Sequence, residues 1–182
     1  MEDGVRTRLI LAGLSELEEH GIKDFSLRRA ALSAQVSCAA PYRHFKDKDE
    51  FILETVRYIR SSWELLCREI EAAFKNDLRR LLIELCMANL GFWLANSNFR
   101  SVLMLSPHET SISREFMKID GYLISTVDKY CLEKSIPDSE QKEFAVRSLI
   151  YGAVMLVGAG EMENNQNTLD MVRKRLEAEF PM

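Results

Sequence analysis

The stretch from Phe25 to Phe45, FSLRRAALSAQVSCAAPYRHF, ends in a cluster of aromatic and basic side chains. Tyr42, Arg43 and His44 stand in a row in this cluster, and Lys48 follows shortly after. Hydroxyl, guanidinium, imidazole and ammonium groups are donors that proteins use to hold phosphate oxygens. The alternative role for the aromatic rings is packing in a small core. We expect that role for Phe45, whereas Tyr42 is expected to pack and to bind.

Two short helices separated by a tight turn are predicted to position this cluster. Ser26 and Ser37 are of a residue type that caps helix N-termini, which predicts helices over residues 27–33 and 38–44. Gly21 is expected to end the helix before them. Such a pair is typical of a helix-turn-helix, whose second helix enters the major groove of DNA.

The basic charge of the chain is concentrated in this region. The formal net charge of the whole chain is −4, which argues against a protein that binds nucleic acid through its bulk charge. Between Lys23 and Lys48, however, six basic residues stand against two acidic ones. A local basic face on an acidic body favours a specific DNA-binding site.

The rest of the chain is predicted to be helical. Apolar residues alternate in steps of four and three from Ile52 to Ala73, which predicts an amphipathic helix of about 25 residues. The segment 78–95 is apolar nearly all round and is expected at the centre of a bundle. We predict an all-α fold of about nine helices. Residues 1–48 are expected to form the helix-turn-helix domain and residues 49–182 a larger bundle. Its further helices are predicted over residues 99–105, 114–134, 138–160 and 168–180.

Composition excludes several other classes of protein. No apolar run is long enough to cross a bilayer, and the N-terminal segment lacks the pattern of a secretion signal, so we expect a cytoplasmic protein. The four cysteines have no close pairing, which argues against a zinc site or a redox pair and predicts free thiols. We expect no metal or cofactor. The cysteines are Cys38, Cys67, Cys86 and Cys131.

The N-terminal pattern resembles the TetR family of bacterial transcriptional regulators. The resemblance covers residues 6–52 and rests on the order of Gly21, Phe25-Ser26, Ala34-x-Val36-Ser37, Tyr42-x-His44-Phe45 and Lys48. The chain departs from the family at two positions. It has Gln35 where the family's turn usually carries glycine, at a cost of about 1 kcal/mol for a left-handed residue with a Cβ. It also has Cys38 where glycine or a polar residue is common.

The resemblance implies which residues contact DNA. Arg28 and Arg29 could instead be a solvated face, and His44 a surface histidine, but the setting favours phosphate contacts for Arg28 and His44. Ala39 and Ala40 are small enough to approach a thymine methyl group. The implied phosphate contacts are Ser26, Arg28, Ser37, Tyr42, His44 and Lys48. The implied base-facing residues are Cys38, Ala39, Ala40 and Arg43.

The resemblance also implies a dimer interface and an effector site in the larger bundle. The C-terminal helix pair could alternatively be a hairpin within one chain, and the effector-site residues could be ordinary core. An aromatic and methionine-rich lining suits a hydrophobic or amphipathic ligand, which Asn89 could orient. The expected interface residues are Gly152, Met155, Leu156, Ala159, Met171 and Leu176. The expected ligand-binding residues are Trp63, Asn89, Phe92, Trp93, Phe99, Met104, Met117 and Tyr122.

The resulting hypothesis is a ligand-responsive repressor that binds a palindromic DNA operator as a homodimer and is released by a hydrophobic small molecule. The alternative is a helical regulator or binding protein that a protein partner controls, with no small ligand. An enzyme is disfavoured because no Ser-His-Asp, metal or phosphate-loop pattern is present. The three histidines, His20, His44 and His108, are scattered along the chain.

Overall fold

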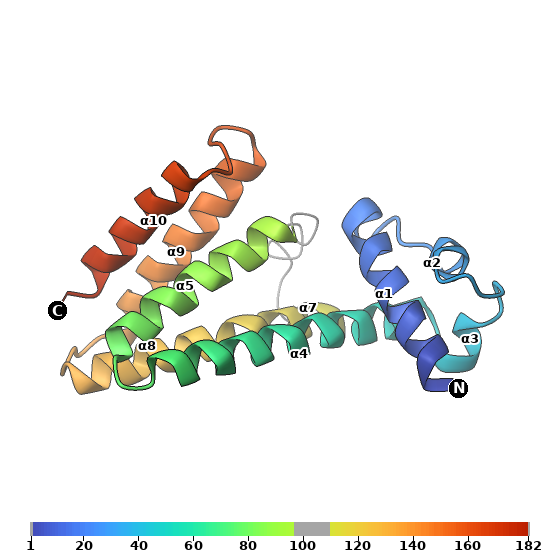
Figure 1. The fold of residues 1–182 in the computed structure, drawn as a ribbon, viewed down its shortest axis with the longest axis horizontal. Helices are drawn as coiled ribbons and strands as arrows, with labels where there is room; N and C mark the ends of the chain where they lie inside the picture. The colour runs from blue at the N-terminus through green and yellow to red at the C-terminus, as the bar shows by residue number, and fades with distance from the viewer. Residues whose placement is uncertain (1, 97–109, 182) are drawn as a thin grey trace. The chain divides into compact units, whose positions relative to one another are not determined.

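A computed structural model describes residues 2–96 and 110–181 of the chain. The predicted all-α fold is confirmed, because the described residues form helices joined by turns and include no strand (Figure 1). They divide into two compact units. Unit 1 contains the residues up to Trp63 and a later segment that ends at Ile119, and unit 2 contains the described residues from Glu64 and from Asp120 onward. The proposed domain boundary at residue 48 remains a prediction.

Unit 1 begins with three helices that surround one small core. The second and third helices pack against the first (Figure 1). Leu9 and Leu17 of the first helix are fully buried in this core. The helices of unit 1 are α1 (Glu2–His20), α2 (Leu27–Ser33), α3 (Pro41–His44), the first part of α4 (Lys48–Phe74) and α7 (Ser111–Met117).

The aromatic ring of Phe51, near the start of α4, lies at the centre of that core. Its centroid is 4.4 Å from the ring of Phe45 and 5.4 Å from the ring of Phe25. Gly13 of α1 faces the same ring, since a Cβ placed there would lie 2.3 Å from Cε1 of Phe51. The absence of a side chain at Gly13 therefore lets α1 approach α4 closely.

The predicted helix over residues 114–134 is broken in the structure. It is replaced by α7, a 3-10 turn (Lys118–Asp120) and α8 (Gly121–Glu133). Within unit 1, the indole N–H of Trp63 donates to the carbonyl of Ile119 at 2.8 Å, and Arg60 pairs with Glu115 at 2.9 Å. Because Trp63 takes up the Ile119 carbonyl, the backbone at the break has a partner outside its own helix.

Unit 2 is a bundle with α5 (Leu78–Ala95) in its middle, as its apolar sequence predicted. This helix packs against α8, α9 (Ser139–Gly158) and α10 (Gln166–Glu179). It also buries residues from one end to the other, from Leu81 to Trp93. A helix buried on most of its surface forms a stable core element without needing a polar face.

The C-terminal helix is tied to the bundle by polar contacts. Arg173 forms two hydrogen bonds to Glu84, at 2.8 and 3.0 Å, and Tyr130 donates to the carbonyl of Pro181 at 2.9 Å. The start of α10 differs from the prediction. Asn165 is the N-cap, and its side chain accepts the backbone N–H of Thr168 at 3.1 Å, so Thr168 lies inside the first turn.

The close approach at Gly13 leads to a stability prediction. Gly13→Ala should lower the free energy of unfolding by about 1 to 3 kcal/mol, because the added methyl group overlaps the ring of Phe51. Urea unfolding followed by circular dichroism measures the change. The matched control is Gly4→Ala in the same helix, where nothing lies within 4 Å of the new Cβ. That variant should be neutral or more stable, and an equal loss in both would contradict the packing argument.

Candidate nucleic-acid interface

The first helix of the predicted motif, α2, is held in place by a buried carboxylate on α1. Glu16 accepts the backbone N–H of Ser26 at 2.9 Å and Nε of Arg29 at 2.9 Å. The hydrogen bond that Arg29 donates to Glu16 raises the pKa of Arg29. Arg29 is thus a structural residue that fixes the start of α2, while Arg28 is exposed to solvent. Glu16 itself was missed, although its place seven residues after Leu9, on the apolar face of α1, was a signal for it.

The turn after α2 adopts the left-handed conformation expected for residue 35. Gln35 has φ of 56°, in the region that favours glycine. Its backbone N–H donates to the carbonyl of Leu32 at 3.0 Å, and that of Val36 donates to Ala31 at 3.0 Å. This pair of bonds is a Schellman motif, which ends α2 and redirects the chain.

The second helix of the motif is shorter than predicted. It covers only Pro41–His44, and residues 38–40 form a turn in which Ala40 N–H donates to the Ser37 carbonyl at 2.9 Å. Proline explains the difference. A helix capped at Ser37 would need the N–H of residue 41 to bond the Ser37 carbonyl, and Pro41 has no N–H. Proline is instead well suited to the first helical position that it occupies.

We call residues 37–44 the reading segment. Its inner side is anchored by Pro41, which is buried, and by the buried ring of Phe45 just beyond it. Its outer side presents Tyr42, whose exposed fraction is 64%, next to exposed Arg43. Of the other predicted contacts, Ala40 and His44 are half-buried. The exposed residues in the segment are Ser37, Cys38, Ala39, Tyr42 and Arg43.

Lys48 and Ser26, two predicted phosphate contacts outside the reading segment, are half-buried. The ammonium group of Lys48 donates to the carbonyl of Lys23 at 3.2 Å and lies 6.0 Å from the ring centroid of Phe25. Lysine has three N–H donors, so this anchor leaves capacity for a further acceptor. The side chain of Ser26 is the N-cap of α2 and accepts the N–H of Arg29 at 3.4 Å.

Comparison with known proteins agrees with this geometry. Residues 9–55 match the family model of bacterial regulatory proteins of the tetR family, and solved structures match over nearly the whole chain. The N-terminal part of the chain thus matches the TetR family model, and the chain shares its fold with solved TetR-family regulators. No curated protein matches it in sequence.

Three solved structures illustrate the shared fold. A proposed TetR-family transcriptional regulator from Rhodococcus sp. is 14% identical with a TM-score of 0.75, over 98% of this chain and 100% of that one. A TetR-family transcription regulator from Marinobacter aquaeolei is 19% identical with a TM-score of 0.64. The match covers 97% of this chain and 95% of that one. The transcriptional regulator FadR from Bacillus subtilis, solved in complex with stearoyl-CoA, is 13% identical with a TM-score of 0.73. The match covers 96% of this chain and 97% of that one.

The ligand-binding residues predicted from the TetR resemblance are distributed over both units. Trp63 and Met117 belong to unit 1, and the indole N–H of Trp63 is already bonded to Ile119. Asn89, Phe92, Trp93 and Tyr122 belong to unit 2. Phe99 and Met104 lie outside the described residues, as do His108 and the predicted helix 99–105.

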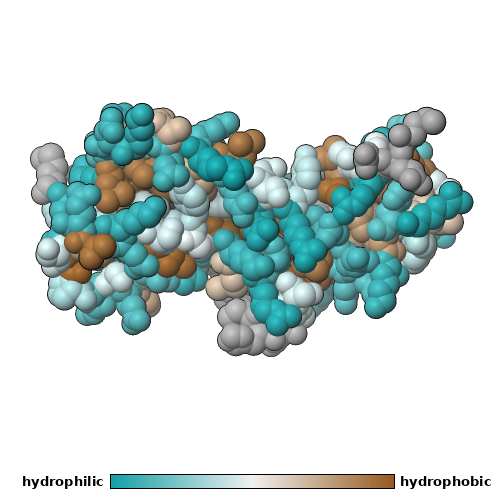
Figure 2. All heavy atoms as spheres, turned by 90° about the horizontal axis from the view of Figure 1, so that it is seen from below, coloured by the Kyte–Doolittle hydropathy of each residue, from teal (hydrophilic) through white to brown (hydrophobic). Residues whose placement is uncertain are grey.

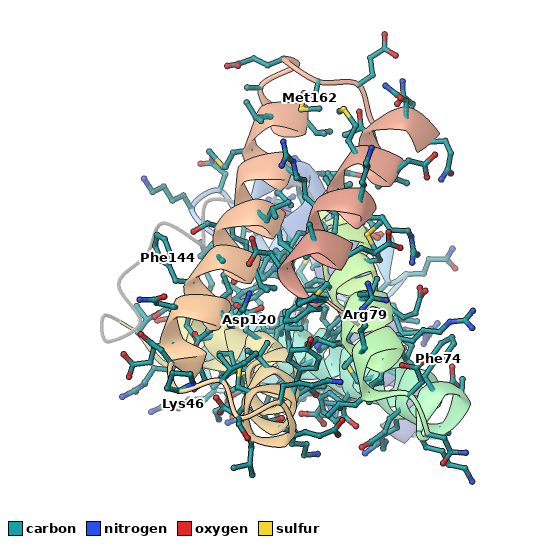
Figure 3. All side chains as sticks on the ribbon, turned by 90° about the vertical axis from the view of Figure 1, so that its left-hand side faces the viewer. Lys46, Phe74, Arg79, Asp120, Phe144 and Met162 are labelled. Atoms are coloured by element: carbon teal, nitrogen blue, oxygen red, sulfur yellow. The ribbon has the colours of Figure 1, made fainter. Side chains whose placement is uncertain are left out.

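In unit 2 the structure brings two of those residues, Asn89 and Trp93, to a buried polar cluster. At its centre is Asp120, whose exposed fraction is 2% (Figure 3). Asn89 Nδ2 donates to this carboxyl at 3.3 Å, the Tyr151 hydroxyl donates to it, and Nε of Arg147 lies 3.6 Å away. Burial raises the pKa of Asp120. These contacts were missed because Asp120 lies in the 3-10 turn and Arg147 and Tyr151 lie on α9, far from it in the sequence.

The other two ligand candidates of unit 2 lie near this cluster or on α8. The ring centroid of Phe92 is 5.2 Å from that of Trp93, and Trp93 is in turn 6.2 Å from Tyr151. The hydroxyl of Tyr122 donates to the carboxylate of Glu71, and burial raises the pKa of Tyr122. Whether any of these residues binds a ligand remains a prediction.

Most predicted dimer-interface residues are accessible. Met155, Leu156, Ala159 and Met171 are exposed, and Gly152 is half-buried. Leu176 is fully buried inside its own unit, so it packs within the protomer and is withdrawn as an interface residue. Exposed hydrophobic side chains occur elsewhere too, and Figure 2 shows separate hydrophobic patches on a mostly hydrophilic face.

Metal binding, membrane spanning and thiol reactivity are further properties that depend on the remaining described residues. Among them, no group of His, Cys, Asp and Glu side chains is arranged to hold a metal ion, and no helix is suited to spanning a bilayer. Each of the four cysteines is a free thiol, exposed at Cys38 and buried at the others. Burial raises the pKa of Cys67 to about 12, so that this thiol stays protonated at neutral pH.

The turn geometry predicts that this chain gains stability from a glycine at position 35, the residue usual there in the TetR family. Gln35→Gly should raise the free energy of unfolding by about 0.5 to 1 kcal/mol, because glycine adopts positive φ without a Cβ clash. Thermal and urea unfolding measure the change. Ser33→Gly, two residues earlier in α2, is the control and should lose about 0.5 kcal/mol. If both glycines destabilise equally, the left-handed residue is not strained.

Proposed function

We propose that this protein is a TetR-type transcriptional repressor that binds a palindromic DNA operator as a homodimer and is released by a small amphipathic ligand. The observation that carries the proposal is the reading segment. Its anchors are buried while Tyr42 and Arg43 are exposed, so the segment is rigidly seated and its outer side is free to enter a groove.

The exposed side chains divide by their chemistry into two groups. Cys38, Ala39 and Arg43 would face bases, since alanine is small enough to touch a thymine methyl group and arginine can bind guanine through two hydrogen bonds. Half-buried Ala40 would join them at the edge of the contact. The hydroxyl, imidazole and cationic groups would hold phosphates, and these residues are Ser26, Arg28, Ser37, Tyr42, His44 and Lys48.

A homodimer would match the two-fold symmetry of a palindromic operator. The candidate surface is the exposed apolar stripe of α9 and α10, formed by Met155, Leu156, Ala159 and Met171 beside the small Gly152. Methionine and leucine at the centre of an interface supply apolar area, and small residues let helices approach closely. Leu176 supports this surface from inside the protomer.

Ligand control would act through α4. This helix follows directly on Lys48 and contributes residues to both units, so a ligand that shifts its position would move the reading segment. If the ligand prefers the state that binds DNA poorly, DNA affinity must fall when it binds. The stearoyl-CoA bound to FadR supports a ligand with an apolar part. A protein partner in place of a ligand is the alternative, and cytoplasmic location fits either.

Two substitutions should separate base contacts from phosphate contacts. With an operator first selected from random DNA, Arg43→Ala should weaken specific binding by about 1 to 3 kcal/mol and relax the preference at one base position. Arg28→Ala should weaken all sequences alike and reduce the salt dependence by about one unit of slope. Fluorescence anisotropy at several salt concentrations measures both.

The control for these two variants is Lys129→Ala. Lys129 is an exposed cation on α8 of unit 2, far from the reading segment in sequence. The Lys129→Ala variant should therefore bind the operator as tightly as the unchanged protein. Loss of affinity in the control alone, or unchanged selectivity in Arg43→Ala, would contradict the assignment.

The dimer surface predicts a second effect of substitution. Leu156, with an exposed fraction of 40%, should be covered in a dimer, so Leu156→Glu would bury a charge and produce monomers. Leu132→Glu is the matched control, since Leu132 is 83% exposed on α8 and lies outside the stripe. Sedimentation velocity distinguishes the two. A dimer that survives Leu156→Glu and dissociates in Leu132→Glu would place the interface elsewhere.

A further inference from the structure

Unit 2 has a hollow on the surface of α9 with a volume of about 590 Å³. This volume falls in the range of sites for drug-sized molecules. Phe144, which projects from the outer side of α9 in Figure 3, supplies an exposed aromatic ring to the hollow. The lining residues are Glu140, Glu143, Phe144, Arg147, Ser148 and Tyr151.

The hollow is connected through two side chains to the buried polar cluster around Asp120. Tyr151 and Arg147 line the hollow, and both also contact the Asp120 carboxyl, Tyr151 by a hydrogen bond and Arg147 at 3.6 Å. Arg147 is held on its other side by Glu143 at 2.9 Å. These two side chains therefore separate the hollow from Asp120, and a rotation of either would join the two.

Behind that partition lie two polar atoms with unused hydrogen-bonding capacity. Asn89 and Trp93 are each 1% exposed, and in the described structure neither Asn89 Oδ1 nor Trp93 Nε1 has a hydrogen-bond partner. Asn89 donates to Asp120 through Nδ2, so its vacant Oδ1, on the same carboxamide, lies close to the Asp120 carboxyl. Trp93 is four residues on, on the same face of α5. Buried polar atoms are seldom left unpaired, so Asn89 Oδ1 suits a bound group that donates a hydrogen bond, and a hydroxyl could also accept from Trp93 Nε1.

The charges around the hollow indicate which kind of polar head group a ligand could carry. Glu140, Glu143 and Asp120 are acidic, and Arg147 is the one base among the described lining and cluster residues. Arg147 is already shared between Glu143 and Asp120. A carboxylate entering this site would meet like charges and offer no hydrogen to Asn89 Oδ1, whereas a hydroxyl or an ammonium group would donate to it.

We propose that this hollow, with Asn89, Trp93 and Asp120 behind it, binds the polar end of a small amphiphile whose head group donates hydrogen bonds and carries no negative charge. The inference rests on the proposed function and specifies its ligand class. The head lies against Asn89 and Asp120, and the apolar part lies along Phe144 and Tyr151. Tyr151 and Arg147 move aside to admit the head.

The site adjoins the proposed dimer stripe on α9, because Ser148 lies four residues before Gly152 and Tyr151 lies four residues before Met155. A ligand seated in the hollow would press on Arg147 and Tyr151, and through Asp120 on the start of α8. This gives the ligand a route to alter the packing of unit 2.

Three probes with one alkyl chain test the ligand class. The purified full-length chain is titrated by calorimetry at neutral pH with octylamine, 1-octanol and octanoate, whose heads are cationic, neutral and anionic. Octylamine and 1-octanol should each bind at least about tenfold more tightly than octanoate. Octanoate binding as tightly as either, or binding by none of the three, would overturn the proposal.

Variants then locate the binding. Asn89→Leu should weaken 1-octanol binding about tenfold, and Glu143→Gln, at a half-buried position, should weaken octylamine binding several-fold. Glu133→Gln, an exposed acid on α8, is the control and should change neither. Thermal unfolding is measured alongside, because Asn89 is buried. If Glu143→Gln folds normally and leaves octylamine binding unchanged, the head does not lie in the hollow.

The failure of this inference and that of the proposed function can be told apart. Operator binding is measured separately on the same protein without any probe. Specific operator binding together with a preference for octanoate would retain the repressor and overturn the ligand class. Probe binding in the expected order with sequence-blind DNA binding would retain the site and overturn the repressor.

Discussion

The ring of Phe51 is the contact on which the DNA-binding part of the molecule depends. It meets Phe25 from the start of α2 and Phe45 from the end of α3, and it fills the space left open by Gly13 on α1. Three segments are therefore fixed against one side chain at the beginning of α4. Because aromatic pairs prefer defined relative orientations, this packing sets the geometry of the reading segment as well as its stability.

Polar contacts complete what the apolar core begins. Glu16 satisfies the backbone at the start of α2 and orients Arg29, which makes the helix start a fixed point. Its burial is tolerable because the charge is paired and hydrogen-bonded. The second unit has a comparable centre at Asp120, but there some buried polar atoms lack partners. One polar cluster is complete and structural, and the other is incomplete in the way expected of a binding site.

Local signals predicted the organisation of the helix-turn-helix well. The Ser26 cap and the left-handed residue Gln35 were visible because each depends on only a few neighbouring residues, whereas the predicted cap at Ser37 was wrong, since α3 begins after Ala40. The length of the second helix was not predicted correctly, since Pro41 was read as part of a helix and not as its first residue. Thr168 was likewise predicted to cap the last helix, whereas Asn165 is the N-cap in the structure. In both cases several residues of suitable type compete, and geometry decides between them.

The sequence by itself determined the all-α fold, the TetR resemblance and the central place of α5. These follow from periodicity and residue type, which act over one or two helical turns. Only the tertiary structure decided that Arg29 pairs with Glu16, that Leu176 is internal, and that Asp120, Asn89 and Tyr151 meet. Such contacts join helices far apart in the chain, and many residues of the right type could have made them. Their selection depends on how whole helices pack, which no short stretch of sequence encodes.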